Sequence, residues 1–371
     1  MKIGIDISML VYQGSGVANY TYNLVKHLLE YDKENEYRLF YSSFRRPKEV
    51  VKKLQELKKL GAKIFDYPFP PWFLKFIWNK FHFFPVEWFI GRVDIFHCSD
   101  FLRPPLLKGT KGITTIHDLT WKIFPQFHTD KIVKGHEEKL EKTIKYKDAI
   151  IVDSQNTKKD LINYYPNIQK TNYINVIYPG IDERFRIIKN KKKILEILKK
   201  YKVEYYSNFL LYVGAIEPRK NLTTAIKIFH QLVTSHQQLV ANFYIVGRAG
   251  WKNEEVFQLI KRLKLKDKVK FIGFVEDDDL VYFYNACKVF IYLSKYEGFG
   301  LPPLEAAACG RPTLLYNNSS LSEIFKKGYP YAKEGKELVT LKKFMNEDLN
   351  LGTFTYDFSW KKYCQDFLKI L

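Results

Sequence analysis

Two carboxylates, Glu297 and Glu305, bracket a glycine- and proline-rich stretch with the sequence EGFGLPPLE. The stretch follows an expected strand over 289–293 and opens an expected helix over 302–309, where proline is tolerated in the first turn. Its glycines let backbone amides approach a ligand closely, and a helix N-terminus attracts anions. Each carboxylate can accept hydrogen bonds from a pair of sugar hydroxyls. Two incidental glutamates in a strand–turn–helix are the alternative, and the small residues that continue through Gly310 argue against it.

Three further side chains could take part in chemistry. Arg219 and Lys220 lie between an expected strand and an expected helix, where a pair of cations could stabilise a diphosphate leaving group without a metal. His117 ends an expected strand over 112–117 and could hydrogen-bond a sugar hydroxyl or a reaction centre. Taken alone, the basic pair is better interpreted as solvated, and the histidine as a satisfied residue at a strand end.

The elements that would position these residues alternate between short β-branched runs and amphipathic helical stretches. This alternation occurs twice, and it predicts right-handed βαβ crossovers and parallel sheets. The expected strands are 2–8, 37–41, 93–98, 112–117, 149–153 and 175–178 in the first half, and 208–214, 241–246, 269–272, 289–293 and 312–316 in the second. We therefore expect an α/β protein with two Rossmann-like, doubly wound domains that face each other across a cleft.

The expected domains are 1–178 and 179–355. The Pro-Gly turn over 178–182 and the basic run over 189–193 place a hinge between them. A final amphipathic helix in 356–371 would cap either domain, with a return to the first as one option.

Composition sets broader limits. A chain of 371 residues suggests two or three domains, no apolar run is long enough to span a bilayer, and the N-terminus is typical of a first strand rather than a signal peptide. Four scattered cysteines are typical of reduced thiols in a cytoplasmic protein. The formal net charge of +20 favours an anionic partner, although lysine-rich helix faces that reflect genome composition explain it equally well.

The stretch over 297–312, EGFGLPPLEAAACGRP, resembles the E-x7-E signature of the GT4-type family of retaining glycosyltransferases, which have the GT-B fold. Four shorter stretches resemble further motifs of this family in the family's order: TIHDL at 115–119, VDS at 152–154, VGAIEPRKN at 213–221 and IGFV at 272–275. The resemblance covers nearly the whole chain and is nearest to bacterial polysaccharide mannosyltransferases.

The resemblance implies that the domain 1–178 lies on the acceptor side and that the domain 179–355 binds the sugar nucleotide. It also implies a role for each matching residue. Glu297 would bind the hydroxyls of the donor sugar, Glu305 the ribose, Arg219 and Lys220 the diphosphate, and His117 would face the transferred sugar. The backbone amides near the sugar and phosphates would be those of Phe299, Gly300 and Leu301, and the loop that approaches the donor phosphates from the N-terminal domain would contain Gly14 and Gly16. Ala215 departs from the family, since some relatives have an arginine there, and this leaves the positive charge to the basic pair.

The implied reaction moves a hexose to a glycan or lipid-linked acceptor in surface polysaccharide synthesis. The expected hexose is mannose, with GDP-mannose as the donor. Transfer of glucose or another hexose from a UDP-sugar is the alternative. The sugar nucleotide is a co-substrate, and no other cofactor and no metal are expected. The D-x-D pattern of Asp277–Asp279 precedes a helix expected near Leu280, so we interpret it as an N-cap rather than a metal site.

An aromatic block over 67–89 carries tryptophan, phenylalanine and interspersed lysine. This composition suits a membrane interface or a lipid-linked acceptor, and it equally suits an aromatic core or a lid over the acceptor. The expected location is the cytoplasm, with the acidic inner face of the plasma membrane as an additional partner.

Two other classes of function fit parts of the sequence. A nicotinamide-dependent oxidoreductase would use Gly14–Asn19, but this loop matches the dinucleotide fingerprint only in part, and the segment 41–45 offers no acidic ribose-binding residue. A non-catalytic protein that binds anionic ligands or nucleic acid would exploit the net charge, but no nucleic-acid motif is present, so no nucleic-acid partner is expected.

Overall fold

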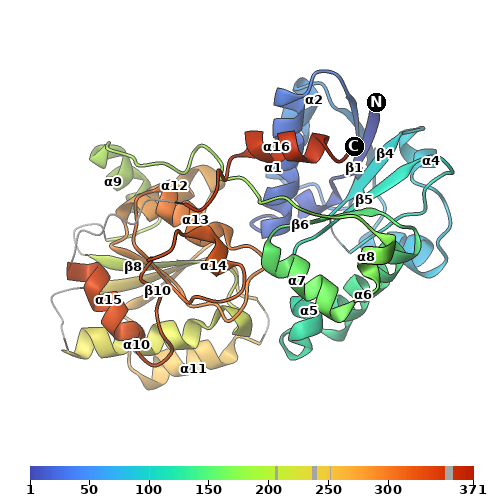
Figure 1. The fold of residues 1–371 in the computed structure, drawn as a ribbon. Coiled ribbons are helices and arrows are strands. Elements are labelled where there is room, and N and C mark those ends of the chain that lie inside the picture. The colour runs from blue at the N-terminus through green and yellow to red at the C-terminus, as the bar shows by residue number, and fades with distance from the viewer. Residues whose placement is uncertain (100, 205–207, 236–239, 251, 347–353) are drawn as a thin grey trace. The chain divides into compact units, whose positions relative to one another are not determined.

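The computed structural model describes residues 1–371 except 100, 205–207, 236–239, 251 and 347–353. The chain forms two compact units (Figure 1). The first unit contains Met1–Gly180 and Phe358–Leu371, and the second contains Ile181–Asp357. The division at Gly180 falls inside the Pro-Gly turn where the sequence places a hinge.

The first unit is built on a parallel sheet with the strand order β3-β2-β1-β4-β5-β6-β7. Its strands are β1 (Lys2–Asp6), β2 (Glu36–Ser42), β3 (Lys63–Tyr67), β4 (Ile95–Cys98), β5 (Lys111–Ile116), β6 (Ala149–Val152) and β7 (Ile174–Val176). Its helical elements are η1 (Ser8–Val11), α1 (Gly16–Tyr31), α2 (Lys48–Lys59), α3 (Pro71–Leu74), η2 (Lys75–Lys80), α4 (Glu87–Ile90), α5 (Thr120–Ile123), η3 (Pro125–Phe127), α6 (Asp130–Lys145), α7 (Gln155–Tyr164), α8 (Ile168–Thr171) and α16 (Trp360–Leu368).

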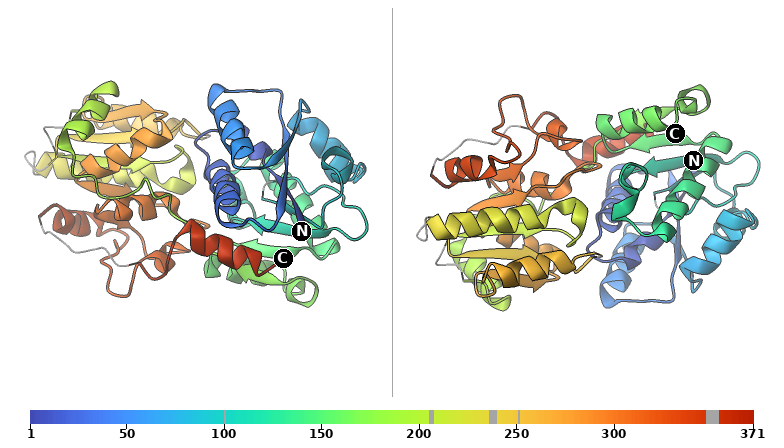
Figure 2. Two further views of the ribbon diagram at one scale, coloured as in Figure 1. Left: turned by 90° about the horizontal axis from the view of Figure 1, so that it is seen from above. Right: turned by 90° about the horizontal axis from the view of Figure 1, so that it is seen from below.

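The end of the chain completes the core of the first unit. Three large side chains of α16, Trp360, Tyr363 and Phe367, are buried in the same hydrophobic cluster as those of α1 and β1. The two ends of the chain lie near each other in this unit (Figure 2). At Gly180 the backbone passes so close to α16 that an added Cβ atom would lie 2.3 Å from the Trp360 nitrogen.

The second unit has a parallel sheet with the order β10-β9-β8-β11-β12. Its strands are β8 (Phe209–Val213), β9 (Asn242–Val246), β10 (Val269–Gly273), β11 (Val289–Tyr292) and β12 (Thr313–Leu315). Its helical elements are α9 (Lys191–Lys200), η4 (Pro218–Lys220), α10 (Leu222–Ser235), α11 (Glu254–Arg262), α12 (Asp277–Ala286), α13 (Leu301–Ala308), α14 (Leu321–Ile324) and α15 (Glu337–Asn346). In Figure 1, α10 and α11 lie on one face of this sheet, and α12 and α13 lie on the other.

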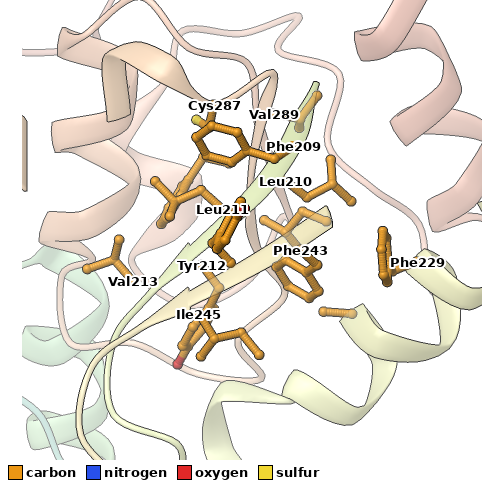
Figure 3. Packing of buried hydrophobic residues seen from close by; sticks show 14 of the residues in the cluster. Phe209, Leu210, Leu211, Tyr212, Val213, Phe229, Phe243, Ile245, Cys287 and Val289 are labelled. Carbon is orange, nitrogen blue, oxygen red and sulfur yellow. The ribbon is translucent and has the colours of Figure 1, made fainter. Parts of the chain in front are cut away.

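Helices cover both faces of this sheet, so its central strands are apolar throughout. All five residues of β8 are buried, and the ring of Phe229 on α10 packs 5.6 Å from that of Phe243 on β9 (Figure 3). Near-continuous apolar strands are typical of buried parallel sheets. The expected α/β architecture with two doubly wound sheets is thereby confirmed.

Several elements differ from expectation. The sequence patterns did not predict β3, α9, α15 or the short helices between 71 and 90. The N-cap interpretation of Asp277–Asp279 was wrong, because α12 begins at Asp277 and its N-cap is Glu276. The three aspartates therefore occupy the first turn of α12, where negative charge favours the positive end of the helix dipole.

Candidate functional site

The residues around Glu297 lie where the strand order of the second unit reverses. In this order β8 is followed on one side by β9 and on the other by β11, and ligands of doubly wound sheets bind at the carboxyl ends of the strands at such a point. Arg219 and Lys220 lie on η4, after β8, and Glu297 follows β11. The fold thus brings together three of the residues singled out in the sequence.

These three residues form a buried ion-pair network. Glu297 Oε2 lies 2.8 Å from an Arg219 guanidinium nitrogen, and Glu297 Oε1 lies 2.7 Å from Lys220 Nζ. Burial alone would raise the pKa of Glu297, but the charges of Arg219 and Lys220 outweigh it and lower the pKa to about 2. Burial and the charge of Arg219 lower the pKa of the Lys220 ammonium. The carboxylate is therefore ionised, and it holds both cations in place.

Two further side chains position the cations. The Lys220 ammonium donates a hydrogen bond of 2.6 Å to the hydroxyl of Tyr292 on β11, and Glu217 Oε1 lies 2.7 Å from Arg219 Nη2. Neither Glu217 nor Tyr292 was identified from the sequence. Glu217 is two residues from Arg219 and could have been suspected, whereas Tyr292 is indistinguishable from a core aromatic residue in a strand.

The loop between Glu297 and α13 is held by the serines of the segment that follows β12. Ser320 Oγ donates hydrogen bonds to the carbonyls of Glu297 (2.9 Å) and Phe299 (2.7 Å). Gly300 is the N-cap of α13 with a φ of 109°, and an added Cβ atom would lie 2.6 Å from Leu321 Cδ2. Only glycine fits this position, because both the left-handed backbone and the close neighbour exclude a side chain. Leu301 is the first residue of α13.

Glu305 lies further along α13, in a different environment from Glu297. Its carboxylate accepts a hydrogen bond of 2.8 Å from the hydroxyl of Tyr284 on α12. Burial raises the pKa of Glu305 to about 7, and the charges of Asp277 and Asp182 also act to raise it. The two glutamates of the motif therefore differ in protonation behaviour, because Glu297 has cations beside it and Glu305 has mainly acidic neighbours.

In the first unit, His117 follows β5 directly and is hydrogen-bonded to a buried carboxylate. His117 Nδ1 lies 2.6 Å from Asp153 Oδ2, whereas His117 Nε2 is buried without a hydrogen-bond partner. The ring of Tyr20, on α1, contacts the imidazole edge to face with centroids 4.7 Å apart. The Tyr20 hydroxyl is in turn hydrogen-bonded to Tyr363 of α16. Nδ1 is thus occupied, and Nε2 is the nitrogen that remains for a ligand.

The glycine loop of the first unit lies between η1 and α1. Gly14 has a φ of 68°, and Ser15 caps α1 by accepting a hydrogen bond of 3.2 Å from the Ala18 amide. Gly16 begins the helix, and an added Cβ atom there would meet nothing within 4 Å. The structure thus places His117 and this loop in the first unit, and the remaining predicted site residues in the second.

Within the described ranges, no group of three or more His, Cys, Asp or Glu residues could hold a metal ion. Two of the three consecutive aspartates at 277–279 have cationic partners. Asp278 pairs with Arg184 at 2.8 Å, and Asp279 pairs with Lys200 at 2.6 Å. Among the residues with described positions, no helix is long and apolar enough to cross a membrane.

Two family models match the chain, one in each half. The model described as Glycosyltransferase Family 4 matches residues 14–185, and the model described as Glycosyl transferases group 1 matches residues 193–338. The second match contains the Glu297 network and the first contains His117 and the glycine loop. The chain belongs to the GT4-type glycosyltransferases. This membership decides against the oxidoreductase and the non-catalytic alternatives.

The chain is similar to curated bacterial mannosyltransferases. O-antigen chain mannosyltransferase B of Escherichia coli is 27% identical over 329 residues, which cover 87% of this chain and 84% of the relative. Serotype-specific mannosyltransferase WbdA of Escherichia coli is 35% identical over 179 residues, which cover 48% of this chain and 22% of that protein.

Solved glycosyltransferase structures share the fold. Sucrose-phosphate synthase from Thermosynechococcus elongatus superimposes with a TM-score of 0.74 at 15% identity, over 100% of this chain and 98% of that chain. HepE from Anabaena, solved in complex with UDP-glucose, has a TM-score of 0.69 at 17% identity, over 100% of both chains. These similarities confirm the GT-B fold class.

Proposed function

We propose that this glycosyltransferase transfers mannose from GDP-mannose to a glycan or lipid-linked acceptor in surface polysaccharide synthesis. The observation that carries the proposal is the Glu297 carboxylate shared between Arg219 and Lys220 at the carboxyl ends of β8 and β11. The names of the similar O-antigen mannosyltransferases support mannose as the sugar. Transfer of another hexose from a UDP-sugar is the second candidate, because the similar HepE structure holds UDP-glucose.

The proposed reaction retains the configuration of the anomeric carbon. The bond between that carbon and the diphosphate oxygen breaks, and Arg219 and Lys220 stabilise the negative charge that develops on the leaving group. The acceptor hydroxyl attacks the same face of the sugar, and its proton passes to the departing phosphate oxygen. Glu297 binds the sugar hydroxyls, Glu305 binds the ribose, and His117 Nε2 binds the transferred sugar.

The same proposal includes independence from metal ions and a cytoplasmic location at the inner face of the plasma membrane. Two cations beside the expected diphosphate supply the positive charge that a metal would otherwise provide. A lipid-linked acceptor would bring the reaction to the membrane surface, where the enzyme would be bound peripherally.

The test is a panel of GDP-, UDP- and ADP-sugars, scored by donor hydrolysis, thermal stabilisation and the anomeric configuration of the product. We expect GDP-mannose to give the strongest stabilisation, a product with retained configuration, and a rate that a chelator does not change. Stronger stabilisation by UDP-sugars would overturn the mannose assignment, and an inverted product would overturn the mechanism.

Site variants test the residue assignment. Removal of one preorganised charge that stabilises a leaving group costs about 10²-fold in rate, and we expect a loss of this size for Lys220→Ala. Lys261→Ala is the matched control, because Lys261 is an exposed lysine on α11, away from the network. A Lys220→Ala enzyme with the wild-type rate would contradict the assigned site.

A further inference from the structure

The first unit has six large, exposed aromatic side chains in one stretch of 17 residues, 72–88. Exposed fractions reach 68% for Trp72, 60% for Trp88 and 59% for Phe81. We call this set the aromatic surface, and its members are Trp72, Phe76, Phe81, Phe83, Phe84 and Trp88. The segment that carries it, α3 to α4, lies at an edge of the unit (Figure 1). Ring contacts link Phe76 to Phe81, and Phe83 and Phe84 to Trp88, and clustered exposed aromatic side chains of this kind mark an interaction site.

The aromatic surface is the outer side of helices whose inner side is already packed. Leu74, Ile77 and Trp78 point into a hydrophobic cluster with β2 and β4. On the outer side, the π-helical turn of η2 brings Phe76 and Phe81 into edge contact, with ring centroids 4.7 Å apart. The outer aromatic rings are therefore not part of this hydrophobic cluster.

The backbone of the loop after η2 holds the exposed rings in place. Trp78 Nε1 donates a hydrogen bond of 3.0 Å to the Phe84 carbonyl, and the Phe83 amide donates one of 2.9 Å to the Ile77 carbonyl. His82 and Phe84 adopt left-handed φ angles of 50° and 63°, which are costly for bulky residues. These contacts fix Phe83 and Phe84 in an outward position despite the strain.

A lysine lies among the exposed rings of the aromatic surface. Lys80 Nζ lies 5.6 Å from the ring centroids of both Phe76 and Phe81. The one acidic residue between positions 71 and 90 is Glu87, which is buried and accepts a hydrogen bond of 3.0 Å from the Leu107 amide.

The neighbouring helix α6 adds charges of both signs. Lys142 and Lys145 act electrostatically on His82, whereas Glu138 lies 3.7 Å from Lys75 and Glu141 lies beside Lys142. These two carboxylates of α6 are thus matched by lysines, and Lys80 remains as a cation among the exposed rings.

We propose that the aromatic surface binds the interface of an anionic lipid bilayer. Tryptophan and phenylalanine rings enter the boundary between headgroups and acyl chains, while lysine extends its ammonium to the anionic headgroups. The binding deepens the membrane association of the proposed function and does not depend on sugar transfer. An acidic protein or a second copy of this chain would bury the rings without requiring lipid. Binding measurements with lipid vesicles alone therefore distinguish lipid binding from both alternatives.

The test measures the binding of the full chain to vesicles of phosphatidylcholine with and without phosphatidylglycerol, at low and high salt. Sedimentation gives the partition coefficient, and the emission of the exposed Trp72 and Trp88 reports their transfer to an apolar environment. We expect binding to the phosphatidylglycerol vesicles with a blue shift, and weaker binding at high salt.

Three variants make the test specific. Phe81→Ser combined with Phe83→Ser is expected to lower the partition coefficient by more than about tenfold, and Lys80→Gln by about fivefold. The control is Tyr173→Ser combined with Ile187→Ser, since these side chains are 85% and 63% exposed outside the aromatic surface. All the changed residues are exposed, so circular dichroism should show unaltered folding.

Two outcomes would overturn the proposal: absence of wild-type binding to anionic vesicles, and equal binding by the aromatic variant and the control variant. A dimer that the aromatic variant dissociates, without vesicle binding, would assign the surface to self-association instead. Donor hydrolysis without vesicles is measured in parallel, so failure of the proposed transferase activity is detected separately from failure of membrane binding.

Discussion

The charge of Glu297 is buried and paired, so we expect it to matter for stability. Its carboxylate is buried with two cations, so removal of its charge takes away the ion pair of Lys220 and leaves Arg219 paired with Glu217. Loss of one partner of a buried ion pair costs about 3–5 kcal/mol, and we expect Glu297→Gln to lower the free energy of unfolding by about 3 kcal/mol at neutral pH. Urea unfolding measures the difference. Glu196→Gln is the matched control, because its pair with Lys193 is exposed to solvent and should contribute little to stability.

The same pair has a pH dependence with a definite sign. The folded pKa of Glu297, about 2, lies below the ordinary value of 4.5, so the folded state favours the ionised form. The stabilisation is therefore complete above pH 4.5 and is lost as the pH falls toward 2. The difference in unfolding free energy between wild type and Glu297→Gln should shrink over this range, and a constant difference would contradict the pairing.

Asp153 is expected to fix the orientation and tautomer of His117. Asp153 Oδ2 lies 2.6 Å from His117 Nδ1, and we expect it to accept a hydrogen bond from a protonated Nδ1, which leaves Nε2 as an acceptor toward a ligand. Asn at this position can present an amide group to Nδ1 and favour the other tautomer. We expect Asp153→Asn to lower the transfer rate by about 10²-fold or more with a smaller change in donor KM.

Two readouts separate positioning from a structural defect. The nitrogen-15 shifts of the His117 ring should show Nδ1 protonated in the wild type and a changed tautomer in Asp153→Asn, and Asp153→Glu should recover part of the rate. Identical His117 shifts in both proteins would contradict the positioning role.

At the scale of elements, the predictable parts are those with local signals. The core strands and the EGFGLPPLE stretch were identified because apolar runs, glycines and prolines report on their own backbone. The sequence does not predict helix α9, because its run of lysines is typical of a polar linker, although Ile194, Ile197 and Leu198 have helical spacing and are buried. The edge strand β3 was missed because its residues are only partly buried.

The supporting contacts of the site could not be predicted for a different reason. Tyr292 lies 72 residues from Lys220, and Asp153 lies 36 residues from His117, so no local pattern links them. The sequence identified the residues that a family motif names, whereas the side chains that hold them depend on which loops the fold brings together.

The close passage of Gly180 past α16 gives a prediction for that helix. A methyl group at Gly180 would displace the backbone of α16, and overpacking of this kind costs about 1–3 kcal/mol. We expect Gly180→Ala to lower the melting temperature clearly. Gly16→Ala is the control, since nothing lies within 4 Å of its added Cβ atom. Equal melting temperatures of Gly180→Ala and Gly16→Ala would show that α16 shifts without a loss of stability, and would contradict the prediction.

At the scale of the whole molecule, the two units have separate hydrophobic cores. The second unit is continuous in sequence, from Ile181 to Asp357, and its core cluster contains residues of this range alone. We expect the fragment 181–357 to unfold cooperatively and to be stabilised by GDP in a thermal-shift measurement. The matched fragment 1–180 lacks α16 and should not unfold cooperatively. A disordered 181–357 fragment would contradict the independence of the two cores.

The return of α16 to the first unit has a consequence for how the protein is made. Domains generally fold in the order of their synthesis, with the N-terminal one first. Here the core of the first unit needs Trp360, Tyr363 and Phe367, which are translated after the whole second unit. The second unit can therefore fold while the first is still incomplete on the ribosome. A chain that terminates before α16 would carry a finished second unit and a first unit in which Tyr20 lacks Tyr363, so truncated products are left without an intact core in the first unit.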